Sequence, residues 1–334
     1  MFKKTNKITF FSAVCAAMLF SACSSDDDVV EKSEPQALRL TATLDEQESR
    51  AATNLQSTQF VSGRPLTVFT FTGTGSSTVF QNNQVGMKAD GSGNIVDYNT
   101  LAQNIFYDPA QAVNVWVISP HFQPKDRPFS DTEEKTSDYE VKTDQSTGEY
   151  NYCVSDLCSG YLYGVKADGK SHIVPMKHLY SKVTVNILPG DDGYTLEESD
   201  ISSIVVNAKT SGTMTFNKLK SPKGTDPIKS VVESTTATKK NVTVGKGTLS
   251  CSAILPPQAI ASGSALVKVT LANGVVWTYT LASQLKLESG KAYQLDLKPN
   301  RPVVGQETDG TQDLKVNIVN WTSVSKSYDY QLNH

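Results

Sequence analysis

The feature that most constrains the fold is an alternation of apolar and polar residues with a period of two, repeated along most of the chain. Residues 36–44, "QALRLTATL", show it clearly, because Leu38, Leu40, Ala42 and Leu44 fall on one face. Successive side chains of a strand point to opposite faces of a sheet, so this pattern predicts a half-buried strand. Similar runs cover residues 64–73, 112–120, 181–190, 200–209, 248–258, 264–282, 292–300 and 313–324.

Clusters of Gly, Asn, Asp, Ser and Pro end these runs, and long stretches with the 3.6-residue period of a helix are missing. The sequence therefore predicts an all-β protein built from Greek-key β-sandwiches. Inside the run 264–282, Asn273 and Gly274 tolerate positive φ and predict a tight hairpin. The polar and charged tract 122–152 is expected to be mostly an exposed insertion.

The N-terminus has the pattern of an export signal. Lys3, Lys4 and Lys7 precede an apolar run of 13 residues, which is shorter than the roughly 20 residues that a bilayer span needs. Residues 1–22 are thus expected to be a signal peptide. Cys23 follows two small residues, and the pattern resembles a bacterial lipobox, in which the chain is cut before the cysteine and lipid is attached to its thiol. An ordinary cleaved signal with an incidental cysteine is the alternative.

The acidic residues after Cys23 resemble the surface-export signal of Bacteroidetes lipoproteins, so 23–35 is expected to be a lipidated acidic linker at the cell outer membrane. Removing 22 residues from 334 leaves a mature chain of 312 residues. At about 150 residues per domain, this length predicts two domains. We place their boundary at "IVPMKHLYSK", which gives an N-terminal domain at 36–177 and a C-terminal domain at 178–334.

Residues that carry chemistry are sparse. Of the four histidines, His178 follows His172 by six positions, yet no third metal ligand has a recognisable spacing, so a structural role is favoured for both. We expect no catalytic residue, no cofactor and no metal, and hence no enzyme. The net charge of −3 gives no reason to expect nucleic acid binding. Cys153 and Cys158 could close a small disulfide loop, but buried thiols at these two positions and at Cys251 are at least as plausible.

Several stretches together resemble the fimbrillin family, the pilus subunits of Bacteroidales. They are "FSACSSDDD" (20–28), "SRAATNLQSTQFVSGRPLTVFTF" (49–71), "SDLCSGYLYG" (155–164), "MKHLYSKVTVNI" (176–187), "ILPPQ" (254–258), "LKLESGKAYQLDL" (285–297) and "IVNWTSV" (318–324). The resemblance implies two transthyretin-like β-sandwich domains in tandem, which agrees with the strand pattern.

The resemblance also implies an assembly mechanism, in which an arginine-specific surface protease removes the first strand from a lipoprotein precursor. Arg50 is the best-placed arginine, because it follows the strand at 36–44 in a polar stretch, whereas Arg39 lies inside that strand and is protected while paired. The donor that refills the groove is expected to be the segment 313–334, in which Leu314, Val316 and Ile318 alternate on one face. The expected partners are other fimbrial subunits, the protease, and the outer membrane through lipid on Cys23.

The sequence is also compatible with two other roles. The protein could be a pilus anchor, which would keep its lipid, or a tip subunit, which would not be polymerised. It could also be a surface glycan-binding lipoprotein, a class that shares the export signal and the preference for β-sandwiches. Exposed aromatic side chains on one platform would mark that class.

Overall fold

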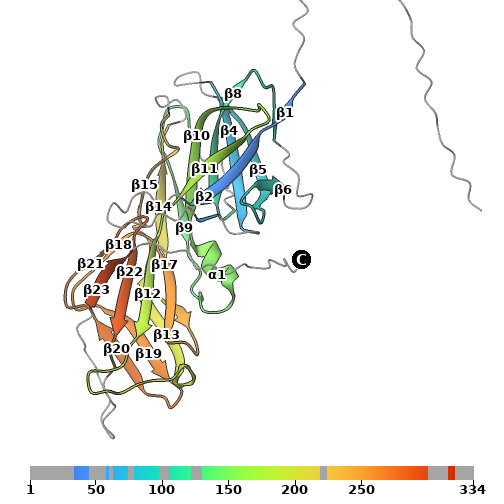
Figure 1. The fold of residues 1–334 in the computed structure, drawn as a ribbon. Coiled ribbons are helices and arrows are strands. Elements are labelled where there is room, and N and C mark those ends of the chain that lie inside the picture. Colours follow the sequence, from blue (N-terminus) through green and yellow to red (C-terminus); the bar gives the residue numbers. More distant parts are fainter. Residues whose placement is uncertain are drawn as a thin grey trace, which may run out of the picture. The chain divides into compact units, whose positions relative to one another are not determined.

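The computed structural model describes residues 34–44, 58–59, 63–73, 79–97, 105–121, 130–218, 224–299 and 315–319. Strands dominate this part of the chain (Figure 1), so the all-β prediction is confirmed. The strand expected at 36–44 is present as β1 (Gln36–Ala37) and β2 (Arg39–Leu44). The hairpin predicted at Asn273 and Gly274 joins β19 (Ala265–Leu271) to β20 (Val276–Thr280), and Gly274 has a φ of 86°.

The first half of the described chain forms an eight-stranded sheet in the order β3-β2-β11-β10-β8-β4-β5-β6. Its two ends meet, since Thr41 of β2 bridges Asn94 and the Ala42 amide donates to the Gly93 carbonyl at 2.8 Å. The enclosed core contains the apolar side chains of β2 together with residues such as Val68 and Val115. The other strands are β3 (Thr58–Gln59), β4 (Pro65–Thr72), β5 (Val79–Ala89), β6 (Ile95–Asp97), β8 (Ala112–Ser119), β10 (Cys158–Lys166) and β11 (Ser171–His178).

The central strands β4 and β8 are buried on both faces, which explains why each carries apolar residues on both of its faces. One face looks into the core just described. The other carries Phe69 and Trp116, whose rings stack with centroids 4.7 Å apart. These rings belong to a second apolar cluster that also contains Phe216 and Tyr180.

That second cluster is covered by a small sheet whose strands come from distant parts of the sequence. β14 (Ser211–Phe216) lies between β15 (Ile228–Glu233) and β9 (Lys135–Glu140). β9 lies within the tract 122–152, so the expected exposed insertion contains a paired strand, although most of the side chains of β9 are exposed. The cluster joins residues from both sides of position 177, and the domain boundary predicted there stays a prediction.

The second half of the described chain contains two four-stranded sheets around a shared apolar core. One has the order β17-β12-β22-β23 and the other β16-β13-β19-β20. Their remaining strands are β12 (Ser181–Ile187), β13 (Ile201–Lys209), β16 (Lys239–Gly245), β17 (Ser250–Leu255), β22 (Ala292–Leu297) and β23 (Lys315–Val319). Short pairs elsewhere are β1 with β7 (Phe106–Tyr107) and β18 (Gln258–Ile260) with β21 (Leu285–Leu287).

The segment between β9 and helix α1 (Gly148–Ser155) covers the outer edges of β16 and β17. Backbone hydrogen bonds join Thr143 and Gln145 to Thr243 of β16. The Gln145 amide group bonds Ile254 of β17 at two points, with Oε1 accepting from its N–H at 2.8 Å and Nε2 donating to its carbonyl at 3.0 Å. The Gln145 side chain thus bonds backbone groups of β17 that a neighbouring strand would otherwise bond. This contact covers an edge that would otherwise be free to pair with another chain.

We expect Gln145→Glu to lower the free energy of unfolding by roughly 1–3 kcal/mol, because the substitution removes the N–H donor and leaves buried carbonyls without their partner. Gln145 is buried and its Nε2 also donates to the Lys142 carbonyl at 3.1 Å. Urea unfolding monitored by tryptophan fluorescence measures the free energy of unfolding of the wild type and of the variant. The exposed Gln111→Glu variant is the matched control, and equal losses in the two variants would contradict a bracing role for Gln145.

Candidate functional site

Strand β2 occupies a position in the first sheet between two neighbouring strands, β11 and β3. We call this position the seat of β2. It runs parallel to β11, from Arg39 opposite Ser171 to Leu44 opposite Met176, and the two strands lie side by side in Figure 1. Its other neighbour, β3, pairs with it over two residues only, Thr43 with Gln59 and Leu44 with Thr58. Most of the backbone pairing of β2 is therefore made with β11.

The apolar side of β2 is completely buried. Leu38, just before β2, and Leu40, Ala42 and Leu44 within it are between 0 and 3 % exposed and belong to the core of the first sheet. Burying a leucine side chain contributes about 2 kcal/mol, so these four residues hold the strand by several kcal/mol before any hydrogen bond is counted. The Leu38 amide also donates to the Ile105 carbonyl at 2.7 Å. If β2 were absent, the core would be open along one strand.

The predicted site residues are only partly within the described part of the chain. Cys23, Arg50 and Leu314 lie outside it. Val316 and Ile318 lie in β23, where their backbones pair with Leu295 and Tyr293 of β22. The predicted donor segment thus contains an edge strand of its own chain's sheet, and β23 is the last strand among the residues that the structure describes.

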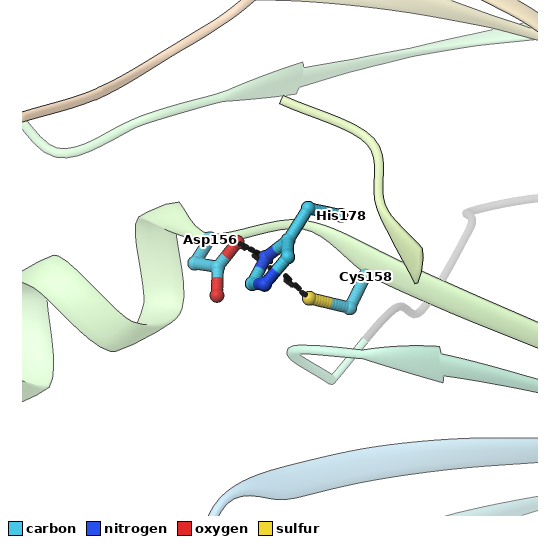
Figure 2. Close-up of side chains that lie close together, drawn as sticks. All are labelled: Asp156, Cys158 and His178. Carbon is cyan, nitrogen blue, oxygen red and sulfur yellow. Dashed lines mark hydrogen bonds and ion pairs between the residues drawn. The ribbon is translucent and has the colours of Figure 1, made fainter. Parts of the chain in front are cut away.

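A buried polar cluster lies where several strands of the first sheet end. Arg64, just before β4, donates through Nε to Ser119 Oγ at 2.7 Å and through Nη1 to Asp156 Oδ2 at 2.9 Å. Its Nη2 donates to the Asp156 carbonyl and lies 3.5 Å from Cys158 Sγ. Figure 2 shows Asp156, Cys158 and His178 converging, with His178 Nδ1 at 2.7 Å from Asp156 Oδ1 and 3.3 Å from Cys158 Sγ.

The charges of the cluster follow from burial and from the neighbours. Burial alone would raise the pKa of the Asp156 carboxyl, but His178 and Arg64 hold it well below its ordinary value. Burial alone would lower the pKa of the Arg64 guanidinium, yet the negative charges that Cys158 and Asp156 carry when ionised raise it above its usual range. Burial and the Asp156 carboxylate raise the pKa of the Cys158 thiol well above its ordinary value, so the thiol is protonated at neutral pH.

The donor set of this cluster is one that could hold a metal ion, because ligand atoms of Asp156, Cys158 and His178 all lie within 4.8 Å of one another. A transition metal would require the Cys158 thiolate and would have to approach beside the Arg64 guanidinium. That guanidinium already contacts two of the three ligands and supplies the positive charge that balances Asp156. The arrangement suits an internal ion-pair network that ties the ends of β4, β8, β10 and β11 together.

The two histidines considered as metal ligands are not brought together around one site. His178 belongs to the buried cluster, whereas His172 Nε2 contacts the Lys166 carbonyl at 2.8 Å and lies 3.5 Å from the Asp168 carboxylate. Cys153, Cys158 and Cys251 are thiols, and no disulfide joins them. Sequence reasoning missed Arg64 and Asp156, because their partnership spans 92 positions and leaves no local pattern.

Comparison with known proteins gives a family. The model of the family described as fimbrillin-like matches residues 49–321. No curated protein matches the sequence. None of the helices in the described part of the chain could serve as a membrane-spanning segment.

Two crystal structures share the fold. A candidate cell adhesion protein from Bacteroides uniformis has a TM-score of 0.56 at 15 % identity, covering 86 % of this chain and 98 % of its own. Another from Bacteroides ovatus has a TM-score of 0.57 at 16 % identity, covering 86 % and 99 %. At these identities the similarity supports the fold alone. Because the family model covers most of the sequence, the chain belongs to the fimbrillin-like family.

Proposed function

We propose that this protein is a structural subunit of a cell-surface fimbria that supports adhesion, exported as a lipoprotein and polymerised by strand exchange after cleavage at Arg50. Family membership supports the coarser part of this proposal, a fimbrial or adhesin-like subunit at the cell surface. The observation that carries the finer part is the seat of β2. Its apolar residues are fully buried, and the segment 45–57, which contains Arg50, connects it to β3.

Cleavage at Arg50 would change how β2 is held, without changing its contacts. Before the cut, β2 is part of the same chain as its seat and rebinds as an intramolecular group, at an effective concentration of roughly millimolar. After the cut, only non-covalent contacts hold it, and a strand from a neighbouring subunit can compete for the same pockets and for the backbone edge of β11. The lipid on Cys23 would leave together with β2.

The segment 313–334 remains the proposed donor. Within the described part of the chain, β23 lies at the edge of its sheet and pairs with β22 alone, so it can leave by breaking that one pairing. Its core sequence alternates Leu314, Val316 and Ile318, as the pockets left by β2 require. Contact between the donor end of one subunit and the groove of the next is heterologous, so repeated contact produces an open filament.

We expect arginine-specific protease to convert the purified wild-type precursor to polymer, whereas Arg50→Lys stays monomeric under the same conditions. Lysine preserves the charge at this position but removes the residue that the protease recognises. Electron microscopy and size-exclusion chromatography would distinguish the two outcomes, and N-terminal sequencing of the wild-type polymer should begin at Ala51. Polymerisation of the Arg50→Lys variant at the wild-type rate would rule out this cleavage site.

A further inference from the structure

The placement of arginine in this chain restricts where an arginine-specific protease can cut. The sequence contains five arginines, and a proline follows three of them, Arg64, Arg127 and Arg301. A bond to proline has no N–H, and the pyrrolidine ring crowds the nitrogen that must leave, so it is a poor substrate. Only Arg39 and Arg50 are not followed by proline, so only the peptide bonds after these two residues are good substrates for an arginine-specific protease. Arg64 is protected a second time, because its guanidinium is buried in the ion pair with Asp156.

The Arg39–Leu40 bond is protected in the folded chain by its place in β2. The side chain of Arg39 is exposed, but its backbone lies in the ladder with Ser171 of β11. Both flanking side chains, Leu38 and Leu40, are 1 % exposed in the core. A protease binds its substrate in an extended and unpaired form, so this bond can be reached only when β2 has left the sheet.

We propose that Arg39–Leu40 is a latent second cleavage site, which opens when β2 leaves its seat after the cut at Arg50. This inference rests on the proposed function, because it needs that first cut. Hydrolysis adds water across the Arg39–Leu40 bond, leaving a carboxylate on Arg39 and an amino group on Leu40. The departed strand is then divided, with Leu38 on the lipid-bearing piece and Leu40, Ala42 and Leu44 on the fragment 40–50.

Dividing the strand weakens the main competitor of an incoming donor. Neither piece carries all four apolar side chains, and the backbone pairing with β11 is interrupted at its first residue pair. Rebinding of each piece is therefore weaker than rebinding of intact β2. The second cut therefore disfavours the return of β2, so that the order of cleavage gives assembly a direction.

A digestion time course on the purified full chain, followed by mass spectrometry, tests this order. The wild type should first give a chain beginning at Ala51 and then the fragment 40–50. In Arg50→Lys, cleavage after Arg39 should be at least roughly tenfold slower than in the wild type, because β2 stays in place. The same variant denatured in urea is the matched control, since it should be cut after Arg39 and not before the three prolines.

The outcomes separate the inference from the proposed function. Cleavage after Arg39 in folded Arg50→Lys at the wild-type rate would overturn the latent site, and so would a wild type that polymerises without releasing the fragment 40–50. A wild-type chain that is never cut after Arg50 would instead overturn the proposed function. Arg39→Lys adds a second readout, because it should keep the first cut unchanged and slow polymerisation by leaving an intact competing strand.

Discussion

Asp156→Ala is expected to lose roughly 3–5 kcal/mol of folding free energy, because it leaves the Arg64 guanidinium buried without its counter-charge. The side chains of this pair are 4 % and 8 % exposed, so water cannot replace the lost partner. Urea unfolding at pH 7 would measure the loss. The exposed pair Lys229–Glu134, with an N–O distance of 2.6 Å, is the matched control, and Glu134→Ala should cost less than about 1 kcal/mol.

A double-mutant cycle separates the ion pair from a simple packing effect. Arg64→Met together with Asp156→Leu should cost less than the sum of the two single variants, because the double variant leaves no buried charge without a partner. If the stability loss of the double variant equals the sum of the losses of the two single variants, the ion-pair network described for this cluster would be contradicted.

The same cluster predicts an acid dependence with a definite sign. The pKa of Asp156 is lowered in the folded state, so its contribution to stability is fully present above the unfolded value of about 4 and is lost as the pH falls below that value. The stability difference between the wild type and Asp156→Asn should therefore be smaller at pH 3 than at pH 5. A difference that grows between pH 5 and pH 3 would contradict the ionised form of Asp156.

A disulfide that fixes β23 to β22 is expected to abolish polymerisation of the cleaved chain. Gln294 and Asn317 face each other across these two strands, so Gln294→Cys with Asn317→Cys can be oxidised to hold the proposed donor in its own sheet. The oxidised variant should be cut at Arg50 and stay monomeric, and reduction should restore polymer. Electron microscopy before and after reduction is the measurement.

The control for this lock is a disulfide that joins two strands not proposed to move. Lys268 and Thr278 face each other in the hairpin of β19 and β20, so Lys268→Cys with Thr278→Cys leaves β23 untouched. This variant should polymerise when oxidised. Polymerisation of the oxidised β22–β23 variant would show that the donor lies elsewhere.

Much of the fold could be predicted from local sequence patterns, because a strand buried on one face alternates and a strand buried on both faces is continuously apolar. The predicted run 36–44 matches β1 and β2, and the run 112–120 matches β8. β9 was missed because "KTSDYE" is mostly exposed and is a strand only through its pairing with β14. The partnership of Arg64 with Asp156 was missed for the same reason, since tertiary contacts alone bring the two residues together.

The pairing of β2 with β11 has a further consequence for the time course of folding. Arg39 and Ser171 are neighbours in the sheet but 132 positions apart in the sequence, and closing so long a loop is slow. During synthesis, β2 has no partner strand until β11 has emerged, so a strand that is made early is among the last that can be placed. The strand that β11 receives late is also the one that the proposed mechanism removes, so maturation would reverse the closing step of folding and leave earlier contacts unchanged.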